Sequence, residues 1–288
     1  MRHTLIILLF TALLNASEVK LHILGSGGPE LQNSASTSYL LSVDEKAKIL
    51  IDVGSGSIEN FSRVDAKIED LEAILITHTH IDHINDLSAF IKAGYFTSRS
   101  KTLPIIGPFG SSIMPSIEEY LHRLFGKKGA YSYMQDVLTK NSDSFMLKPI
   151  VMPKSIQKTK IAPNILITSI NVNHGIIPAL AFRVEIDDKV FVFSGDTTAK
   201  SDNLLKIAKN ADFFVAHFAI PEFGYNIAAQ LHMRPSKIAQ IANSANVKHL
   251  ILSHLMKRSI KSKEESIKII KKIYSGNVSI ASDLMTFY

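Results

Sequence analysis

The chain has 288 residues, of which 46% are hydrophobic and 20% are charged, so it can bury the core of a globular domain. It contains no cysteine, which excludes disulfides and thiolate metal ligands, so any transition metal must be held by histidine and carboxylate. The net charge of +6, from 32 basic and 26 acidic residues, suits anionic substrates or nucleic acid, but the lysines are dispersed along the chain.

The N-terminal segment MRHTLIILLFTALLNA joins a basic start at Arg2 to an apolar run that ends at Leu14, with the small residue Ala16 after it. The run is too short to cross a bilayer, and it lies where the apolar region of a secretory signal peptide belongs. We therefore predict a signal peptide over residues 1–16 and a secreted or periplasmic protein that has no membrane contact after the signal is removed. A buried first strand or an uncleaved anchor is the alternative interpretation.

Short apolar runs bounded by turn residues predict strands at 19–24, 37–43, 48–53, 73–77, 164–172, 179–186, 189–194, 212–217 and 249–254. Helical patterns cover 86–95, 112–125, 202–209, 235–245 and 262–274. This order predicts packed sheets with helices outside them, in one domain over residues 17–288 without a linker.

Ser262 and Glu265 have the spacing of a capping box, which predicts that the lysine-rich stretch from 257 to 272 is the solvated face of a helix rather than a phosphate-binding patch.

Residues 95–163 are rich in proline and weakly periodic. We expect them to form a long excursion between core strands, over or near the functional site, of the kind that forms lids or binding surfaces.

The stretch THTHIDH follows the apolar run AILIT and brings four metal-ligand side chains together. Strict alternation along an extended chain puts His78, His80 and Asp82 on one side, and a turn into the next helix would bring His83 round as well. Neutral imidazoles and carboxylates are good donors to zinc, iron or manganese. The stretch therefore predicts part of a metal site, with hydrogen-bonded loop histidines as the alternative.

Three other predicted strands end in the same residue types. His174 follows INVN, Asp196 lies in SGDT, and His254 lies in LILSHL. A single histidine after a strand is usually a hydrogen-bonded surface or core residue, but three separate strand ends with such side chains are hard to obtain by chance. They predict the other half of the metal site.

The chain resembles the metallo-β-lactamase superfamily from LGSGGP at 24–29 to the C-terminus. The resemblance rests on features that follow one another in the same order: the H-x-H-x-D-H pattern of HTHIDH, then His174, SGDT and SHL. The resemblance implies an α/β (α+β) fold, the αββα four-layer sandwich, with a site for two divalent metal ions, zinc first among them, along one edge of the sheets. It assigns one ion to His78, His80 and His174, the other to Asp82, His83 and His254, and the bridge between them to Asp196.

Such a site implies hydrolysis. Two cations about 3.5–4 Å apart lower the pKa of a shared water to about 7, so that hydroxide attacks at neutral pH. The second oxygen of Asp82 is the expected general base, in addition to its role as a ligand. The resemblance makes Asp52, in ILIDVGSG, the carboxylate that orients a ligand histidine. A turn aspartate before Gly54 is the alternative for Asp52.

Within the superfamily, His80 argues against the oxygen-reducing di-iron branch, and Asp196 argues against the true β-lactamases. LGSGGP and the segments ADFFVAHFA and LHMR resemble the ribonuclease Z and arylsulfatase-like branch. His217 and His232 retain the histidines of its His-Glu-Ala-Thr and Gly-His-Ser-Thr motifs, and either one is expected to protonate a leaving oxygen or to stabilise a charged oxygen. Phe218 replaces the glutamate of the first motif, which puts tRNA cleavage in doubt.

Three further features bear on the substrate. The interval between His174 and Asp196 is too short for the tRNA-gripping arm of many ribonuclease Z chains. Arg234 is either a planar contact for a sulfate or phosphate or an exposed residue at the start of helix 235–245. The GSGGP turn lacks the lysine of a nucleotide-binding loop and is predicted as a tight turn near the metals, where glycine permits a positive φ.

We therefore expect an exported binuclear hydrolase of a small-molecule ester, with sulfate or phosphate esters as the first choice. A ribonuclease Z-like phosphodiesterase is the alternative, although nucleic acid is the disfavoured substrate. Lactone or β-lactam hydrolysis is a further alternative, and a binding module without catalysis is the most remote. A homodimer is compatible with the sequence.

Overall fold

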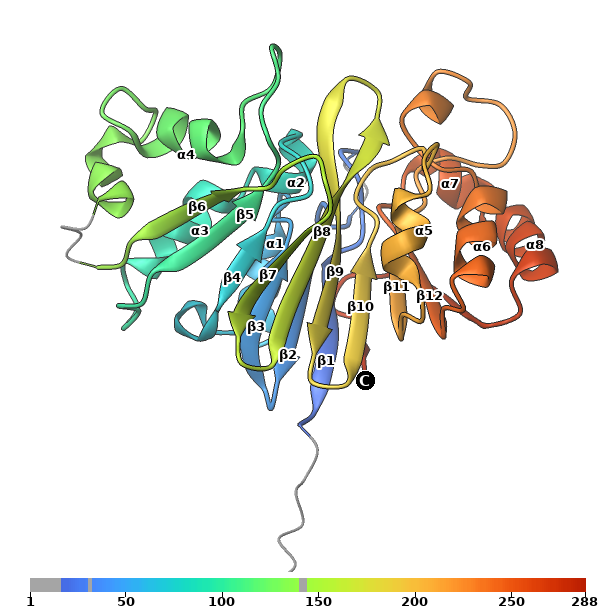
Figure 1. Ribbon diagram of the computed structural model, residues 1–288, viewed down its shortest axis with the longest axis horizontal. Helices are drawn as coiled ribbons and strands as arrows, with labels where there is room; N and C mark the ends of the chain where they lie inside the picture. Colours follow the sequence, from blue (N-terminus) through green and yellow to red (C-terminus); the bar gives the residue numbers. More distant parts are fainter. Residues whose placement is uncertain (1–16, 31–32, 140–143) are drawn as a thin grey trace, which may run out of the picture.

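The computed structural model describes residues 17–30, 33–139 and 144–288. Its framework is a pair of seven-stranded sheets (Figure 1). The first sheet contains, from one edge to the other, β14 (Thr286–Phe287), β1 (Val19–Gly25), β2 (Ser38–Val43), β3 (Lys46–Ile51), β4 (Ala73–Leu75), β5 (Leu103–Gly107) and β6 (Leu147–Val151). The second contains β13 (Asn277–Ile280), β12 (His249–Ser253), β11 (Phe213–His217), β10 (Lys189–Phe193), β9 (Ile177–Ile186), β8 (Ile165–His174) and β7 (Gln157–Ala162).

The strands of each sheet are antiparallel in one half and parallel in the other. In the first sheet β3, β4, β5 and β6 run parallel to one another, and in the second sheet β10, β11, β12 and β13 do so. Strand β8 is antiparallel to β9, which is antiparallel to β10, so β8 and β10 point the same way. The carboxyl ends of β8, β10, β11 and β12 therefore meet at one edge of the second sheet.

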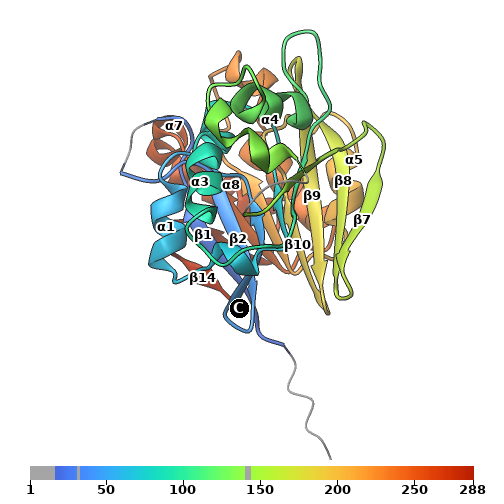
Figure 2. The same ribbon diagram turned by 90° about the vertical axis from the view of Figure 1, so that its left-hand side faces the viewer.

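Apolar side chains fill three layers between the elements. One cluster, which includes Phe182, Phe191 and Phe193, lies between the two sheets. A second is sealed on the outer face of the first sheet by α1 (Ser57–Arg63), α3 (Leu87–Gly94) and α4 (Ile117–Phe125). A third lies on the outer face of the second sheet under α5 (Asn203–Ala208), α6 (Pro235–Ser244) and α8 (Lys263–Ile273). The predicted four-layer αββα sandwich in a single domain is thus confirmed (Figure 2).

All nine predicted strand segments and all five predicted helices are present. The expectation for residues 95–163 needs correction. They supply β5 and β6 to the first sheet and β7 to the edge of the second, rather than a long excursion between core strands. Pro104 and Pro149 lie inside β5 and β6. Proline within an apolar run argues against a strand, which is why the sequence pattern missed both.

The predicted capping box at Ser262 is also absent. Helix α7 (Lys257–Lys261) ends immediately before α8, and the Ser262 side chain makes no cap hydrogen bond. The φ of −109° and ψ of 17° at Ser262 are not the extended backbone that an N-cap requires. A complete capping box is found instead at α4, between Ser116 and Glu119.

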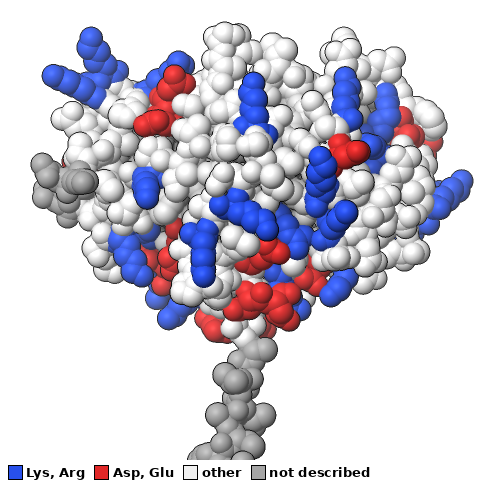
Figure 3. Space-filling model, viewed as in Figure 1, with Lys and Arg blue, Asp and Glu red and all other residues white. Residues whose placement is uncertain are grey.

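Shorter elements complete the chain: α2 (Ile81–Ile84) and the 3-10 turns Ile68–Asp70, Ser132–Leu138 and Ala228–Gln230. Residues 1–16, predicted as a signal peptide, lie outside the described residues. No helix within the ranges given above combines the length and the apolarity needed to cross a bilayer. Figure 3 shows basic side chains scattered over one face with acidic ones among them, which agrees with the dispersed lysines of the sequence.

Candidate metal centre

The predicted ligand residues come together at one edge of the two sheets. His174 ends β8, and Asp196 and His254 follow β10 and β12. The remaining four follow β4, with Asp82 and His83 inside the short helix α2 at the upper edge in Figure 1. Carboxyl ends of strands are the usual place for a ligand site in α/β proteins. Six of the seven side chains are buried and His80 is half-buried.

His78, His80, His174 and Asp196 form a first cluster. His80 Nδ1 lies 3.0 Å from His78 Nε2 and 3.4 Å from His174 Nε2. Asp196 Oδ2 lies 3.9 Å from His78 Nε2 and 3.7 Å from His174 Nε2. Tetrahedral bonds of about 2.1 Å to zinc hold ligand atoms about 3.4 Å apart. The spacing of these four side chains therefore fits a divalent ion.

A second cluster lies on the other side of Asp196. His83 Nε2 is 3.5 Å from Asp82 Oδ2 and 3.8 Å from Asp196 Oδ2. His254 Nε2 is 3.5 Å from Asp196 Oδ1 and 3.9 Å from Asp82 Oδ2. Asp196 thus contacts both clusters, the position that the resemblance gives to a bridging carboxylate.

An unpaired nitrogen at this second cluster also fits a metal ion. His83 Nε2 is buried and has no hydrogen-bond partner among the described residues. A buried polar atom left without a partner costs about 1–3 kcal/mol. A cation that accepts this lone pair would remove the cost.

Hydrogen bonds on the outer side of three rings direct their Nε2 atoms inward. His83 Nδ1 donates to Asp52 Oδ2 at 2.7 Å, and His174 Nδ1 donates to the Leu231 carbonyl at 2.9 Å. Thr37 Oγ1 donates to the Gly27 carbonyl, so it accepts from His254 Nδ1 at 2.7 Å. Such outer partners fix the tautomer and the orientation of metal-binding histidines. Asp52 therefore lies where the resemblance expects it.

The electrostatics of the site favour cation binding. Burial lowers the pKa of His78, His80 and His254, which keeps these rings in the neutral form that binds metals. Burial alone would raise the pKa of Asp196, but the nearby His254 and His232 and the hydrogen bond from His217 hold it well below its usual range.

His83 is the exception among the ligand histidines. Burial lowers its pKa, but the carboxylates of Asp52 and Asp82 outweigh that effect and raise it to about 9. A metal ion at Nε2 would displace the proton that these carboxylates favour.

The two histidines predicted as catalytic occupy different positions. His232 Nδ1 lies 3.7 Å from Asp196 Oδ2 and has no hydrogen-bond partner within the part of the chain that the structure describes. His217 is engaged at both nitrogens: Nδ1 donates to Asp196 Oδ1 at 2.8 Å, and Nε2 lies 3.2 Å from the Tyr39 hydroxyl. His217 also groups with His83, Asp196 and His254 within 4.8 Å, which the sequence pattern did not indicate.

Arg234 lies directly before α6, at the start of the helix, and its side chain is half-buried. Its guanidinium donates to the carbonyls of Pro221 at 3.2 Å, Glu222 at 2.5 Å and Gly224 at 3.0 Å. These carbonyls belong to an irregular loop and find no partners in a strand or helix, which explains why the guanidinium turns toward them. Arg234 therefore braces the loop before α6, and a contact with a substrate anion stays a prediction.

The GSGGP turn lies against His254. Its glycines, however, do not serve the purpose expected from the sequence. None of Gly25, Gly27 and Gly28 has a positive φ. Close approach explains the glycines: a Cβ at Gly28 would lie 3.2 Å from His254 Nε2, and one at Gly25 would lie 1.7 Å from the Ser36 carbonyl oxygen.

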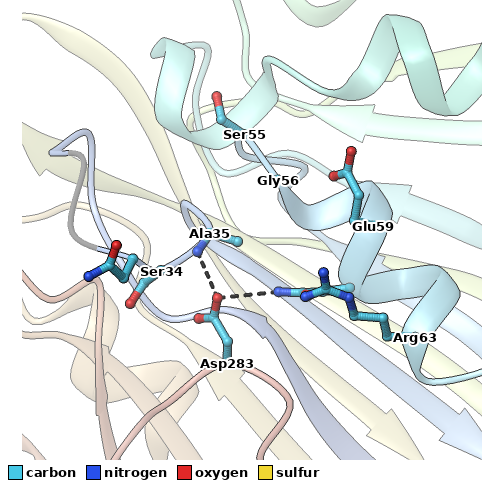
Figure 4. A pocket seen from close by; sticks show the side chains of 9 residues that line it. Ser34, Ala35, Ser55, Gly56, Glu59, Arg63 and Asp283 are labelled. Atoms are coloured by element: carbon cyan, nitrogen blue, oxygen red, sulfur yellow. Dashed lines mark hydrogen bonds between the residues drawn. The ribbon is translucent and has the colours of Figure 1, made fainter.

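Asp283 anchors this turn and was missed by sequence reasoning, because no motif surrounds it. Its Oδ1 accepts from Ser26 N at 2.9 Å and its Oδ2 accepts from Ala35 N at 2.7 Å, so it ties both ends of the loop between them. Figure 4 shows Asp283 below Ala35, in a surface pocket of about 590 Å³ that Glu59 and Arg63 of α1 also line. The same loop leads into Thr37, the partner of His254.

Comparisons with known proteins agree with this geometry. A ribonuclease Z of Mycobacterium bovis (strain BCG / Pasteur 1173P2) is 25% identical over 278 residues, which cover 92% of this chain and 96% of that protein. The metallo-β-lactamase fold protein YhfI from Bacillus subtilis superposes with a TM-score of 0.74 at 23% identity, covering 93% of this chain and 98% of YhfI. Human tRNase Z, short form, superposes with a TM-score of 0.71 at 17% identity, with coverage of 93% and 98%.

The family assignment comes from a match along most of the chain. The family model described as Anti-Pycsar protein Apyc1 matches residues 19–272, which include all seven predicted ligand residues. The structural neighbours show that the fold is that of the metallo-β-lactamases, as the resemblance implies. The chain therefore belongs to the Anti-Pycsar protein Apyc1 family.

Proposed function

We propose that this metal-dependent hydrolase cleaves phosphodiester bonds with two divalent cations, zinc by preference, held in the two clusters that share Asp196. The observation that carries the proposal is this shared carboxylate between two sets of inward-facing imidazoles. Paired cations suit the in-line displacement of a phosphodiester, because they clamp both the attacking and the leaving oxygen. The similarity to ribonuclease Z over 92% of the chain favours this substrate class over the sulfate ester that the sequence pattern favours.

The side chains around the cations have separate tasks. When bound, the cations supply a nucleophilic water at neutral pH and offset the charge of the phosphoryl group. Asp82 presents Oδ2 to His83 and His254, and its second oxygen is the general base that accepts a proton from water. His232, whose Nδ1 is unpaired among the residues described, donates a proton to the leaving oxygen.

A small phosphodiester fits the architecture better than tRNA. His174 and Asp196 are separated only by β9, β10 and tight turns, which leave no projecting arm to grip a large nucleic acid. This observation supports a compact substrate that is held close to the metals. A short RNA remains the second candidate, because the sequence similarity to ribonuclease Z extends over nearly the whole chain.

The proposal is tested by a substrate panel with and without chelator. We expect bis(p-nitrophenyl) phosphate to be turned over faster than p-nitrophenyl sulfate, p-nitrophenyl phosphate, a lactone or a β-lactam. EDTA should abolish the reaction and Zn²⁺ should restore it. A tRNA precursor with a 3′ trailer tests the RNA alternative. Faster turnover of the sulfate ester, or activity that survives removal of all metal, contradicts the proposal.

We also propose that the protein is exported, from the basic start and the apolar run of residues 1–16. Cell fractionation combined with mass spectrometry of the N-terminus tests this. A protein found only in the cytoplasm with Met1 or Arg2 still present contradicts it.

A further inference from the structure

A single buried hydroxyl lies between the two clusters of the metal centre. Thr77 directly precedes His78, and its Oγ1 lies 2.8 Å from Asp52 Oδ2 and 3.1 Å from His78 Nδ1. Asp52 Oδ2 also accepts from His83 Nδ1 at 2.7 Å. His78 belongs to the first cluster and His83 to the second. Thr77 is therefore connected to a ligand of each cluster, although it is not a ligand itself.

The direction of each hydrogen bond in this chain of contacts follows from the protons available. Thr77, Asp52, His78 and His83 are all fully buried. An ionised carboxylate only accepts hydrogen bonds, so the one hydroxyl proton of Thr77 goes to Asp52. The hydroxyl oxygen then accepts the proton on His78 Nδ1. His78 and His83 therefore both carry a proton on Nδ1 and turn Nε2 toward the clusters, the arrangement that metal-binding histidines need.

The backbone fixes Thr77 at this point. Its N–H donates to Asp52 Oδ1 at 2.7 Å, so Thr77 binds both oxygens of that carboxylate. Its carbonyl accepts from Leu180 N at 2.9 Å, which joins the segment after β4 to β9 of the second sheet. A Cβ at Gly195, the residue before the shared Asp196, would lie 3.0 Å from Thr77 Cβ. Thr77 thus packs where the two sheets meet, beside the loop that carries the shared carboxylate.

Asp52 depends on these contacts because its backbone conformation is uncommon. Its φ is 55°, in the left-handed region that residues other than glycine rarely adopt. Such a conformation persists only where the surrounding structure holds it. The Thr77 N–H and hydroxyl supply two of the hydrogen bonds that hold the Asp52 side chain.

We propose that Thr77 positions metal ligands in both clusters through its one hydroxyl, and so sets the affinity of the protein for both cations. The inference rests on the two-cation site of the proposed function, and it adds a positioning residue outside the ligand set. Removal of the hydroxyl leaves His78 Nδ1–H without its acceptor and removes one of the donors that hold Asp52 against His83. Loss of an outer hydrogen bond of this kind costs about 10–100-fold in metal affinity.

Withdrawal of Zn²⁺ from the purified holoenzyme by a chromophoric chelator of known affinity measures the dissociation constants of both ions. Thr77→Val replaces the hydroxyl by a methyl group of similar size. We expect both dissociation constants to rise about tenfold or more. Thr77→Ser keeps the hydroxyl and should return both constants to values close to those of the wild type. Thr77→Ala also lacks the hydroxyl, and it repeats the measurement if Thr77→Val does not fold.

The same substitution at two other buried threonines provides matched controls. The Thr37 hydroxyl accepts from His254 Nδ1, which belongs to the second cluster. Thr37→Val should therefore weaken the binding of one ion and leave that of the other close to wild type. The Thr168 hydroxyl in β8 has no hydrogen-bond partner among residues 17–30, 33–139 and 144–288. Thr168→Val should leave both dissociation constants unchanged.

NMR of protein labelled with ¹⁵N-histidine gives a second readout, which does not depend on the number of bound ions. An imidazole N–H proton moves to higher field when it loses its acceptor. We expect the His78 Nδ1 proton to move in this way in Thr77→Val and to keep its position in Thr77→Ser. The His83 Nδ1 proton should move less, because Asp52 Oδ2 still accepts it.

A raised dissociation constant for only one ion in Thr77→Val overturns the inference, as does a loss of affinity that Thr77→Ser does not restore. A circular dichroism spectrum equal to that of the wild type excludes misfolding as the cause. If the wild type holds fewer than two ions per chain, the two-cation site of the proposed function fails. The His78 signal then decides the connection by itself: an unchanged position in Thr77→Val overturns it, and a shift to higher field supports it. The two failures are therefore distinguishable.

Discussion

His217 Nδ1 donates a hydrogen bond of 2.8 Å to Asp196 Oδ1, while Asp196 Oδ2 faces the histidines of both clusters. Burial raises the pKa of the Tyr39 phenol, so its hydroxyl stays protonated and can donate to His217 Nε2. These two contacts select the tautomer of His217 that carries its proton on Nδ1. These contacts let His217 orient the shared carboxylate. The role expected from the sequence, to protonate a leaving oxygen or to stabilise a charged one, stays a prediction.

Replacement of His217 by alanine should therefore weaken metal binding. Loss of an outer hydrogen-bond partner of a ligand typically costs 10–100-fold in metal affinity or activity. We expect a loss of about this size by competition with a zinc chelator, and a smaller one in Tyr39→Phe. His249→Ala, in the same sheet but bonded to Ser279, is the control. Unchanged affinity together with a rate loss confined to substrates with poor leaving groups would show that His217 is a proton donor instead.

Removal of the shared carboxylate should disrupt both clusters at once. In Asp196→Ala each cluster loses its common oxygen ligand, and the imidazoles around it lose their counter-charge. We expect phosphodiester hydrolysis to fall by at least about 10³-fold, since the water nucleophile depends on both cations. Elemental analysis should find less metal per chain than in the wild type. Full hydrolysis with an unchanged metal content contradicts the bridging assignment.

His232 should affect turnover without affecting metal binding. A positioned general acid contributes about 10²–10⁴-fold, and the contribution is greatest for leaving groups that need a proton. We expect His232→Ala to slow alkyl diesters far more than p-nitrophenyl diesters, whose leaving group departs without protonation. The measurement is kcat for both substrate types alongside metal content. A variant that loses a metal ion would place His232 among the ligands.

Asp283 should influence the centre through the glycine-rich turn. Asp283→Asn replaces a charged acceptor of four donors by a neutral one; the donors are Ser26 N, Ser26 Oγ, Ala35 N and Asn60 Nδ2. We expect a loss of about 1–3 kcal/mol in the free energy of unfolding and weaker metal retention, because the turn packs on His254. Glu59→Gln changes a carboxylate in the same surface pocket and serves as the control. Equal stability of the two variants would refute the anchoring role.

His22 should make the stability depend on pH, independently of the metal centre. Burial lowers its pKa, and its ring bonds to Thr286 Oγ1 at 3.1 Å and Ser42 Oγ at 2.9 Å, across β14, β1 and β2. The unfolded chain, with a pKa of about 6.5, therefore binds a proton before the folded chain does as the pH falls. Stability should decrease below about pH 6.5, and His22→Gln should flatten this dependence in urea titrations between pH 7 and 5. An identical pH dependence in the variant contradicts this account.

Much of the fold and of the metal centre could be predicted from local patterns. Alternating apolar runs located the inner strands, because those strands are buried on at least one face and lie between turn residues. The ligand residues were predictable because each one lies at the end of such a strand or in the short segment that follows β4, and parallel strands bring those ends together. Strands β5 and β6 were missed because Pro104 and Pro149 obscure the pattern.

By itself the sequence determined the fold class, the seven candidate ligands and the hydrolytic chemistry that they imply, since these depend on residue types in a fixed order along the chain. Only the tertiary structure decided what surrounds them: that His217 binds Asp196, that Arg234 braces a loop, and that Asp283 anchors a turn more than 240 positions away, as its bond to Ala35 shows. The bond of Asp283 joins residues 248 positions apart, and the other two join a strand end or a helix start to a neighbouring loop, so all three depend on how the elements pack. No local spacing encodes that packing.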